Sequence, residues 1–133
     1  MLLLDTHALL WLDRDDANLG PQSRNAIAAA WAEGLLAVSS ISFWEVALLQ
    51  QRGRIALACA PDSWRHDWLQ AGLREIPLDG GIALRATTLA HFHPDPADRF
   101  LTATALNQGA RLLTADQAIL DWHDPLPRLN ARH

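Results

Sequence analysis

Short aliphatic segments without polar alternation constrain the fold of this chain most strongly. Three of them, at residues 1–4, 35–39 and 111–114, consist mainly of Leu, Ala and Val. A strand that helices cover on both faces has such a run, whereas a strand with one solvated face alternates apolar and polar residues. Segments of helical periodicity separate the three runs. The sequence therefore predicts an α/β fold with a mainly parallel central sheet.

Capping residues and apolar periodicity predict where the helices and one further strand lie. No repeat or low-complexity tract interrupts them, so we expect residues 1–133 to form a single domain around one core. The expected helices are 6–12, 21 to a stop at Gly34, 42 to about 53, a segment that includes Trp64 and Trp68, about 81–89, and one that begins after Asp95. Residues 75–78 are expected to form the further short strand, and residues 91–96 a loop.

The basic residues and the single cysteine narrow the range of chemistry. All eleven basic residues are Arg, and the absence of Lys excludes a P-loop, a Schiff base and a lysine beside a phosphorylated aspartate. The formal net charge of −4 argues against a protein that coats nucleic acid, but not against a local basic groove. Cys59 cannot form an internal disulfide and is expected in the core or a loop. Because no apolar leader opens the chain, we expect a cytoplasmic protein without a membrane segment.

Four carboxylates occupy positions that belong to one edge of such a sheet. Asp5 and Asp116 follow predicted strands, and Glu45 and Asp98 occupy the first turns of predicted helices. In an open parallel sheet the carboxyl ends of the strands and the starts of the following helices lie on the same edge. We therefore predict that the side chains of these four residues converge.

Three of the four acids also have a purely structural interpretation. A capping residue satisfies free N–H groups at a helix start, and acids are favoured in the first turn. Asp5 lacks such an alternative, because a carboxylate that closes a buried strand must find donors, a metal or solvent. The structural alternatives are a capping box Ser42-x-x-Glu45, a first-turn position for Asp98, and a capping box Thr114-x-x-Gln117 around Asp116.

Convergence of four acids favours a divalent cation, because like charges gathered on one edge repel unless a cation neutralises them. Oxygen ligands alone favour Mg²⁺ or Mn²⁺ over zinc, which usually recruits His or Cys. The chain contains no HExxH motif and no paired cysteines. We therefore expect Mg²⁺ or Mn²⁺ as the cofactor, with a metal-activated water as the nucleophile.

The segments around these acids resemble the blocks of a known family. Their order and spacing are similar to those of PIN-domain proteins, and most of all to VapC-type toxins of bacterial toxin–antitoxin pairs. Four ordered blocks are far more specific than one acidic motif, and the likeness runs from the first strand to about Asp116. The blocks are Leu-Leu-Asp-Thr-His-Ala-Leu-Leu-Trp at 3–11, Ser-Phe-Trp-Glu-Val-Ala at 42–47, Asp-Pro-Ala-Asp-Arg-Phe-Leu at 95–101 and Leu-Thr-Ala-Asp at 113–116.

The resemblance implies a fold, an activity and partners. It implies a three-layer α/β/α domain whose four acids bind Mg²⁺ or Mn²⁺ and hydrolyse RNA phosphodiesters, so that the protein would be an endoribonuclease. Asp5 and Asp98 would be the surest metal ligands, with Glu45 and Asp116 completing the site. It also implies a homodimer and a cognate VapB-type antitoxin that blocks the acidic site.

Several neighbouring residues are candidates for supporting roles. Asp95 is expected to cap its helix or to support a metal ligand, and Thr114 to act as a cap or to hold Asp116. Arg99 is expected to contact a phosphate or to pair with the acids, and Arg52 and Arg54 to line an RNA path or to be merely solvated.

The histidines and tryptophans have mainly structural interpretations. We interpret His7 as a residue of the helix start and expect none of the six histidines to bind the metal. The expected role of the tryptophans at 11, 31, 44, 64 and 68 is core or interface packing rather than base stacking. Trp122 lies in a loop-like segment and stays unassigned.

Two functions of other classes remain as alternatives. A phosphatase of the haloacid dehalogenase kind also begins with a strand followed by Asp, but it needs a second acid where His7 stands and a lysine. The other alternative is a catalytically silent PIN-like module that binds partners through its surface. Retention of all four acids counts against it.

Overall fold

The central sheet confirms the predicted strand arrangement and extends it by one strand. A computed structural model describes all residues, 1–133. Its five strands are paired in parallel throughout, in the order β3-β2-β1-β4-β5. The strands are β1 (Leu2–Leu4), β2 (Leu36–Ser39), β3 (Arg74–Ile76), β4 (Arg111–Thr114) and β5 (Arg128–Asn130).

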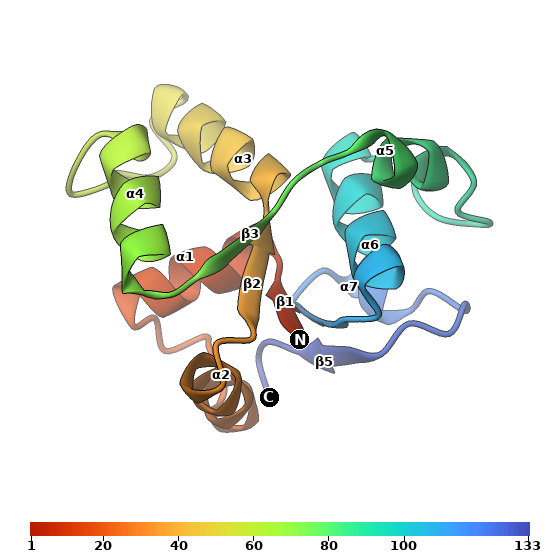
Figure 1. The fold of residues 1–133 in the computed structure, drawn as a ribbon, viewed down its shortest axis with the longest axis horizontal. Coiled ribbons are helices and arrows are strands. Elements are labelled where there is room, and N and C mark those ends of the chain that lie inside the picture. The colour runs from red at the N-terminus through yellow and green to blue at the C-terminus, as the bar shows by residue number, and fades with distance from the viewer.

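Seven helices cover the two faces of this sheet and complete a three-layer α/β/α fold (Figure 1). The first four lie on one side of the sheet in Figure 1, and the last three lie on the other. The helices are α1 (Thr6–Arg14), α2 (Pro21–Ala32), α3 (Ser40–Gln51), α4 (Pro61–Ala71), α5 (Gly80–Thr87), α6 (Pro96–Gln108) and α7 (Gln117–Leu120). None of them is long and apolar enough to span a membrane.

Alternate residues of the inner strands fill two separate cores, which explains why the strands show no polar alternation. Leu2 and Leu4 pack in the core beneath the first four helices, whereas Leu3 packs in the core on the other side. In β4, Leu113 and Leu112 divide in the same way. All five side chains are at most 5% exposed. Since both faces of β1 and β4 are buried, both faces must be apolar.

The strand register sets the positions of the side chains that follow the strands. Leu4 of β1 pairs with Val38 of β2 on one side and with Leu113 of β4 on the other. The backbone N–H of Asp5 donates to the carbonyl of Leu113 at 3.0 Å, so Asp5 lies beside the end of β4. The first residue after β1 and the last residue of β4 therefore share the carboxyl edge of the sheet.

The start of α3 differs from the sequence prediction. The helix begins at Ser40, and Ser39 is its N-cap, with a side chain that accepts from the N–H of Ile41. Ser42 therefore lies inside the helix and the predicted Ser42-x-x-Glu45 capping box is wrong. Consequently Glu45 occupies the second turn of α3 and not the first. The run of serines at 39, 40 and 42 offers three candidate caps, and the chain uses the earliest one.

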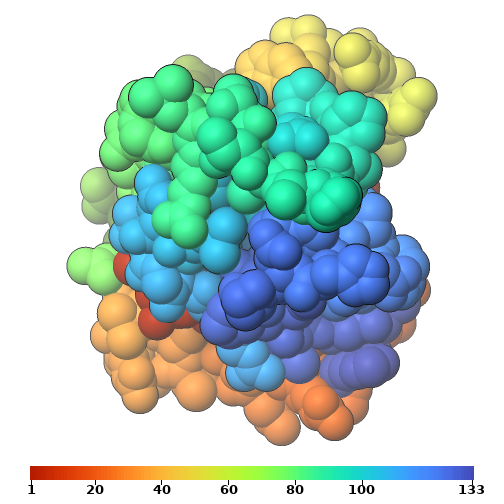
Figure 2. Space-filling model, turned by 90° about the vertical axis from the view of Figure 1, so that its right-hand side faces the viewer, coloured from red at the N-terminus to blue at the C-terminus, as the bar shows by residue number.

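The C-terminal segment forms a strand that the sequence analysis did not assign. In β5 the side chains of Arg128, Leu129 and Asn130 are all half-buried, so the strand lacks the aliphatic run of the inner strands. The residues beyond it pack against Gly20, where a Cβ atom would come within 2.2 Å of the backbone of His133. Figure 2 views the α5–α7 side, where the blue C-terminal residues form a large part of the surface and little of the red N-terminal segment is visible.

The aromatic residues confirm the packing prediction only in part. Trp64 is buried and meets Trp68 edge to face, and Trp68 meets Trp31 in the same way. Trp122 is also buried, and its indole N–H donates to the carbonyl of Ala90 at 2.8 Å. Trp44 is 57% exposed, so it does not pack in the core, and packing in an interface stays a prediction for this residue. Cys59 lies exposed in the loop before α4, which agrees with a loop position and not with a core one.

Candidate functional site

The four predicted acids line one pocket at the carboxyl edge of the sheet. The pocket has a volume of about 390 Å³. Only three of its eleven lining residues are hydrophobic. The lining residues are Asp5, Thr6, His7, Trp11, Glu45, Asp95, Asp98, Leu101, Ala115, Asp116 and Arg132. The chain thus brings together carboxylates that are up to 111 residues apart in sequence, 116 − 5 = 111.

Asp5 is the most buried acid of the pocket, with 5% of its surface exposed. It is the N-cap of α1, and its Oδ1 accepts from the N–H of Ala8 at 2.7 Å. Its Oδ2 accepts from the hydroxyl of Thr114 at 2.6 Å. Burial raises the pKa of the Asp5 carboxyl above its ordinary value, although these two hydrogen bonds oppose the shift.

Glu45 reaches the pocket from α3 and is held by a residue of α1. The hydroxyl of Thr6 donates to Oε1 of Glu45 at 2.5 Å and lies 3.0 Å from the hydroxyl oxygen of Ser42. Burial raises the pKa of Glu45 above its ordinary value, and the negative charge of Asp95 adds to this effect. A threonine hydroxyl therefore fixes Glu45 just as another fixes Asp5.

Asp98 and Asp116 enter the pocket from the other side, from the start of α6 and the loop before α7. Oδ1 of Asp116 accepts from the N–H of Ile119, which makes Asp116 the N-cap of α7. Thr114 is therefore not the cap, and the predicted Thr114-x-x-Gln117 capping box is wrong. Burial raises the pKa of Asp98 to about 7, and the charge of Asp116 is the next largest cause. Four carboxylates gathered in one pocket form a site suited to a cation.

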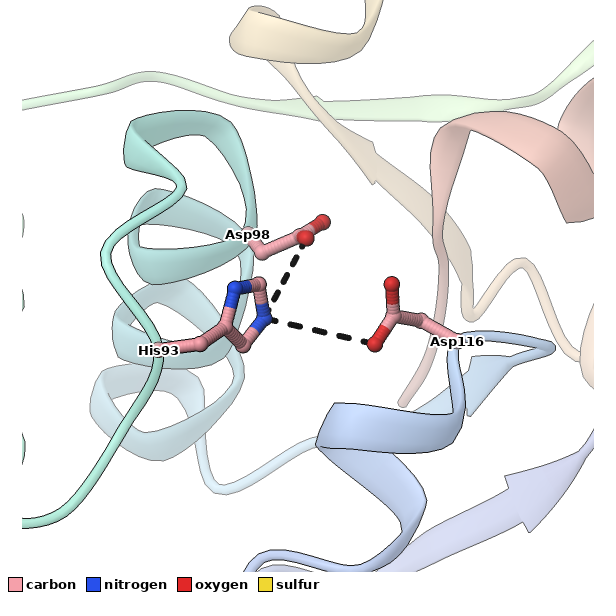
Figure 3. Close-up of side chains that lie close together, drawn as sticks. All are labelled: His93, Asp98 and Asp116. Carbon is pink, nitrogen blue, oxygen red and sulfur yellow. Dashed lines mark ion pairs between the residues drawn. The ribbon is translucent and has the colours of Figure 1, made fainter.

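His93 is a fifth titratable side chain at this site that the sequence analysis missed. Its Nε2 atom lies 3.3 Å from Oδ2 of Asp98 and 4.0 Å from Oδ1 of Asp116. Figure 3 shows the imidazole facing the gap between the two carboxylates. The Nε2 atom is buried and makes no hydrogen bond. The signal in the sequence was only weak, because His93 lies in a loop without periodicity and nothing there distinguishes it from His91, which is exposed.

The three residues predicted to support the site have different positions in the structure. Asp95 is the N-cap of α6, accepts from the N–H of Asp98 at 3.0 Å and lines the pocket. Thr114 binds Asp5 and also accepts from the N–H of Asp116 at 3.0 Å, so it joins the two sides of the site. Arg99 does not line the pocket. Its guanidinium donates to the carbonyls of Ala86, Phe92 and His93.

Three further residues, Arg132, Trp11 and His7, line the pocket beside the acids. The guanidinium of Arg132 lies over the ring of Trp11, 5.2 Å from its centroid, and donates to the carbonyl of Ala115 at 3.0 Å. Arg132 was not singled out in the sequence, because it follows Asp116 by 16 residues in a segment without a motif, 132 − 116 = 16. His7 lies exposed in the first turn of α1 and also lines the pocket. An arginine and an aromatic ring therefore stand beside the acids.

A second, shallower pocket continues from the first along α3. Its volume is about 250 Å³, and it shares His7, Glu45 and Asp95 with the acidic pocket. Arg52 and the exposed Trp44 also line it. Arg54 does not line it. Of the two arginines considered for an RNA path, only Arg52 adjoins the site.

Comparison with known proteins identifies the family of this fold and site. The sequence profile of the PIN domain family matches residues 2–122. This chain belongs to the PIN domain family. Ribonuclease VapC22 from Mycobacterium tuberculosis is 35% identical to this PIN domain over 127 residues, which cover 95% of each chain. The resemblance recognised in the sequence is thus confirmed.

Solved structures support the fold of this PIN domain. A structure of VapBC2 from Rickettsia felis bound to a DNA fragment from its promoter contains a chain that is 14% identical, with a TM-score of 0.72 and 97% of each chain covered. A toxin-antitoxin complex from Klebsiella pneumoniae contains a chain that is 20% identical, with a TM-score of 0.57 and 87% of each chain covered. At these identities the likeness establishes the three-layer fold.

The residues of this PIN domain fit a divalent cation. The donors are carboxylate oxygens, which hard divalent ions prefer, together with the Nε2 atom of His93. Nε2 of His93, one oxygen of Asp98 and one of Asp116 lie within 4.8 Å of one another. The buried Nε2 atom without a hydrogen bond is a second indication, since buried polar atoms of proteins are normally paired.

Proposed function

We propose that this PIN domain is a metal-dependent endoribonuclease that acts as the toxin of a type II toxin–antitoxin pair. The observation that carries the proposal is the convergence of Asp5, Glu45, Asp98 and Asp116 on one polar pocket. The name of its relative, Ribonuclease VapC22, supports RNA as the substrate. We also propose that residues 1–133 act as one domain. The first strand, β1, and the last strand, β5, belong to the same sheet, because both pair with β4.

We propose that Asp5, Glu45, Asp98 and Asp116 hold Mg²⁺ or Mn²⁺. A bound divalent ion neutralises clustered acids, orients a phosphodiester and activates water for attack on phosphorus. Within the chain, Thr114 and Thr6 fix the carboxylates of Asp5 and Glu45 through their hydroxyls. Asp95 fixes the start of the helix that carries Asp98. No protein nucleophile is needed, because the acids supply ligands and orientation only.

The substrate path in this proposal runs across the acids through the two adjoining pockets, each of which is lined by an arginine and a tryptophan. Arg132 lies over Trp11 in the acidic pocket, and Arg52 and Trp44 both line the second pocket. Arginine binds phosphates through its planar fork, and exposed aromatic rings stack on unpaired bases. Such pairs suit single-stranded or loop RNA, whose bases are free to leave the stack. They also place positive charge beside an otherwise acidic site.

We further propose the partners and location that follow from a toxin function. The similarity to VapBC2 from Rickettsia felis and to the toxin-antitoxin complex from Klebsiella pneumoniae supports a VapB-type antitoxin as the partner. A homodimer and a cytoplasmic location are part of the same proposal.

The two alternative functions are less well supported by the site. A phosphatase of the haloacid dehalogenase kind needs a second acid at position 7 and a lysine, and the chain has His7 and no Lys. A silent binding module gives no reason to gather four acids in one pocket, where burial raises the pKa values of Asp5, Glu45 and Asp98.

The decisive experiment incubates the purified protein with single-stranded and stem-loop RNA in Mg²⁺, in Mn²⁺ and in EDTA. Cleavage in either ion and none in EDTA supports the proposal. The variants Asp5→Asn and Asp98→Asn are expected to reduce cleavage by more than about 100-fold, because even residues that only support metal ligands are worth about 10- to 100-fold. Both substitutions keep the volume of the side chain, so the melting temperature should show an intact fold.

Arg111→Ala provides a matched control, since this exposed residue begins β4 at the opposite end of the strand. It should cleave like the wild type. Equal cleavage by Asp5→Asn, Asp98→Asn and the wild type would overturn the proposal. Turnover of p-nitrophenyl phosphate without RNA cleavage would favour the phosphatase, and turnover of neither substrate would favour the binding module.

A further inference from the structure

We infer that His93 is a nitrogen ligand of the metal site and makes the site prefer Mn²⁺ to Mg²⁺. The inference rests on the proposed metal dependence and adds to it a residue and a choice of ion. It goes against the sequence expectation that no histidine of the chain binds the metal.

The position of the Nε2 atom of His93 matches that of a ligand. It lies 3.3 Å from Oδ2 of Asp98 and 4.0 Å from Oδ1 of Asp116. Ligand atoms that surround one ion at about 2.1 Å are about 3 to 4 Å apart. Nε2 makes no hydrogen bond with either carboxylate, although both are close. In Figure 3 the ring faces the gap between Asp98 and Asp116, where an ion would contact all three side chains.

The surroundings of His93 fix the imidazole in this position. Its ring stacks on that of Phe92, with centroids 4.6 Å apart and an angle of 26° between the planes. The ring of Phe92 in turn meets the buried Trp122 edge to face. A ligand whose position is set by packing before the ion arrives loses little conformational entropy on binding.

Arg99 holds the backbone of the same loop. It donates to the carbonyl of His93 at 3.0 Å and to the carbonyl of Phe92 at 2.8 Å. A third donation, to the carbonyl of Ala86 at 2.9 Å, ties the loop to the end of α5. Its guanidinium also lies over the ring of Phe92, 5.8 Å from the centroid. Arg99 is thus a positioning residue for His93, which explains why it turns away from the pocket.

The identity of the donor atom determines the choice of ion. Mg²⁺ is a hard ion that takes oxygen ligands and keeps several waters, whereas first-row transition ions accept imidazole nitrogen. Asp5, Glu45, Asp98 and Asp116 alone would serve either ion. An added imidazole stabilises the complex with Mn²⁺ more than the complex with Mg²⁺.

Metal titration of the intact protein by calorimetry tests the inference without reference to RNA cleavage. His93→Ala is expected to lower the affinity for Mn²⁺ by at least about 10-fold and the affinity for Mg²⁺ much less. His93→Gln, which offers an oxygen in place of the nitrogen, should likewise reduce the preference for Mn²⁺. His91→Asn is the matched control, because His91 is an exposed neighbour in a left-handed conformation that Asn tolerates. It should bind both ions as the wild type does.

Pulsed electron paramagnetic resonance of the Mn²⁺ complex gives a second readout. The wild type should show a directly coordinated ¹⁴N nucleus, and this coupling should disappear in His93→Ala and persist in His91→Asn. If His93 acts only as a positive partner of the acids, His93→Ala will instead raise the affinity for both ions equally, and the inference is overturned. Binding of Mn²⁺ without a ¹⁴N coupling overturns it as well. A wild type that binds neither ion would overturn the proposed function itself.

Discussion

The two sides of the acidic pocket hold their carboxylates in different ways. Asp5 and Glu45 each accept a short hydrogen bond from a threonine hydroxyl that belongs to another element of the fold. Asp98 and Asp116 instead face the imidazole of His93, which makes no hydrogen bond to either of them. The first side is therefore fixed by these hydrogen bonds, whereas the second still has one unpaired atom, Nε2 of His93. We therefore expect the first side to orient the carboxylates and the second side to be completed by a bound ion.

Thr114→Val should have the largest effect on this comparison, because Thr114 is the residue that joins the two sides. The substitution removes the donor to Asp5 and the acceptor for the N–H of Asp116 without changing the size of the side chain. Metal affinity, measured by calorimetry, and RNA cleavage are both expected to fall by about 10- to 100-fold.

Thr102→Val is a matched control for this substitution. Thr102 is also completely buried, but its hydroxyl oxygen has no hydrogen-bond partner. Replacing it should leave metal affinity unchanged and leave the melting temperature equal or higher, because no buried hydroxyl remains unpaired. The same loss of metal affinity in both variants would show that the effect comes from packing and not from the Asp5 hydrogen bond.

The stability of the metal-free protein should depend on pH through Asp98. The pKa of Asp98 is raised from 3.8 to about 7, so between these values the folded state binds more protons than the unfolded state. The free energy of unfolding should therefore fall as the pH rises from about 4 to about 7 and level off above it. Thermal melts in EDTA at a series of pH values measure this slope.

Asp98→Asn provides the control for this pH dependence, and it should make the slope smaller. Some slope should remain, because burial also raises the pKa values of Asp5 and Glu45. Added Mn²⁺ should raise the melting temperature most at high pH, where the acids are ionised and an ion binds them best. An identical slope in Asp98→Asn and the wild type would contradict the assignment of a raised pKa to Asp98.

The smallest effect is expected at Asp95, where capping and charge can be separated. Asp95→Ala removes the N-cap of α6 and should lower the free energy of unfolding by about 1 kcal/mol, measured by urea denaturation. Asp95→Asn keeps a cap oxygen but removes a charge that raises the pKa of Asp98 and of Glu45. It should lose little stability and bind a metal ion at lower pH. Equal losses of stability in the two variants would show that charge and not capping matters.

The inner strands and the positions of the acids were predictable because local sequence determines them. The aliphatic runs at β1, β2 and β4 are buried on both faces, and the residues that follow them must lie at the carboxyl edge. The edge strand β5 was not predictable in this way, because Arg128 and Asn130 are polar and its pairing depends on β4. Its formation is a consequence of tertiary contacts and not of its own pattern.

The side chains around the acids were harder to predict than the acids themselves. Serine is a common N-cap residue, so the sequence alone allows any of Ser39, Ser40 and Ser42 to cap α3. The end of β2 at Ser39 decides which of them does. His93 and Arg132 lie in segments without periodicity. His93 faces Asp98 and Asp116, and Arg132 lines the pocket, because tertiary contacts fix those segments. Such contacts leave no signal at a regular spacing.

The parallel register of β1 and β4 limits how the length of this chain can change during evolution. Because Leu4 lies opposite Leu113, Asp5 meets Thr114 only while both strands keep their lengths. One inserted or deleted residue in either strand would turn an acid or its partner to the opposite face of the sheet. The turn at Gly34, where a side chain would meet open space, has no such restriction. Drift in length is therefore expected to accumulate in the loops at the other edge, while the strands that precede the acids change by substitution only.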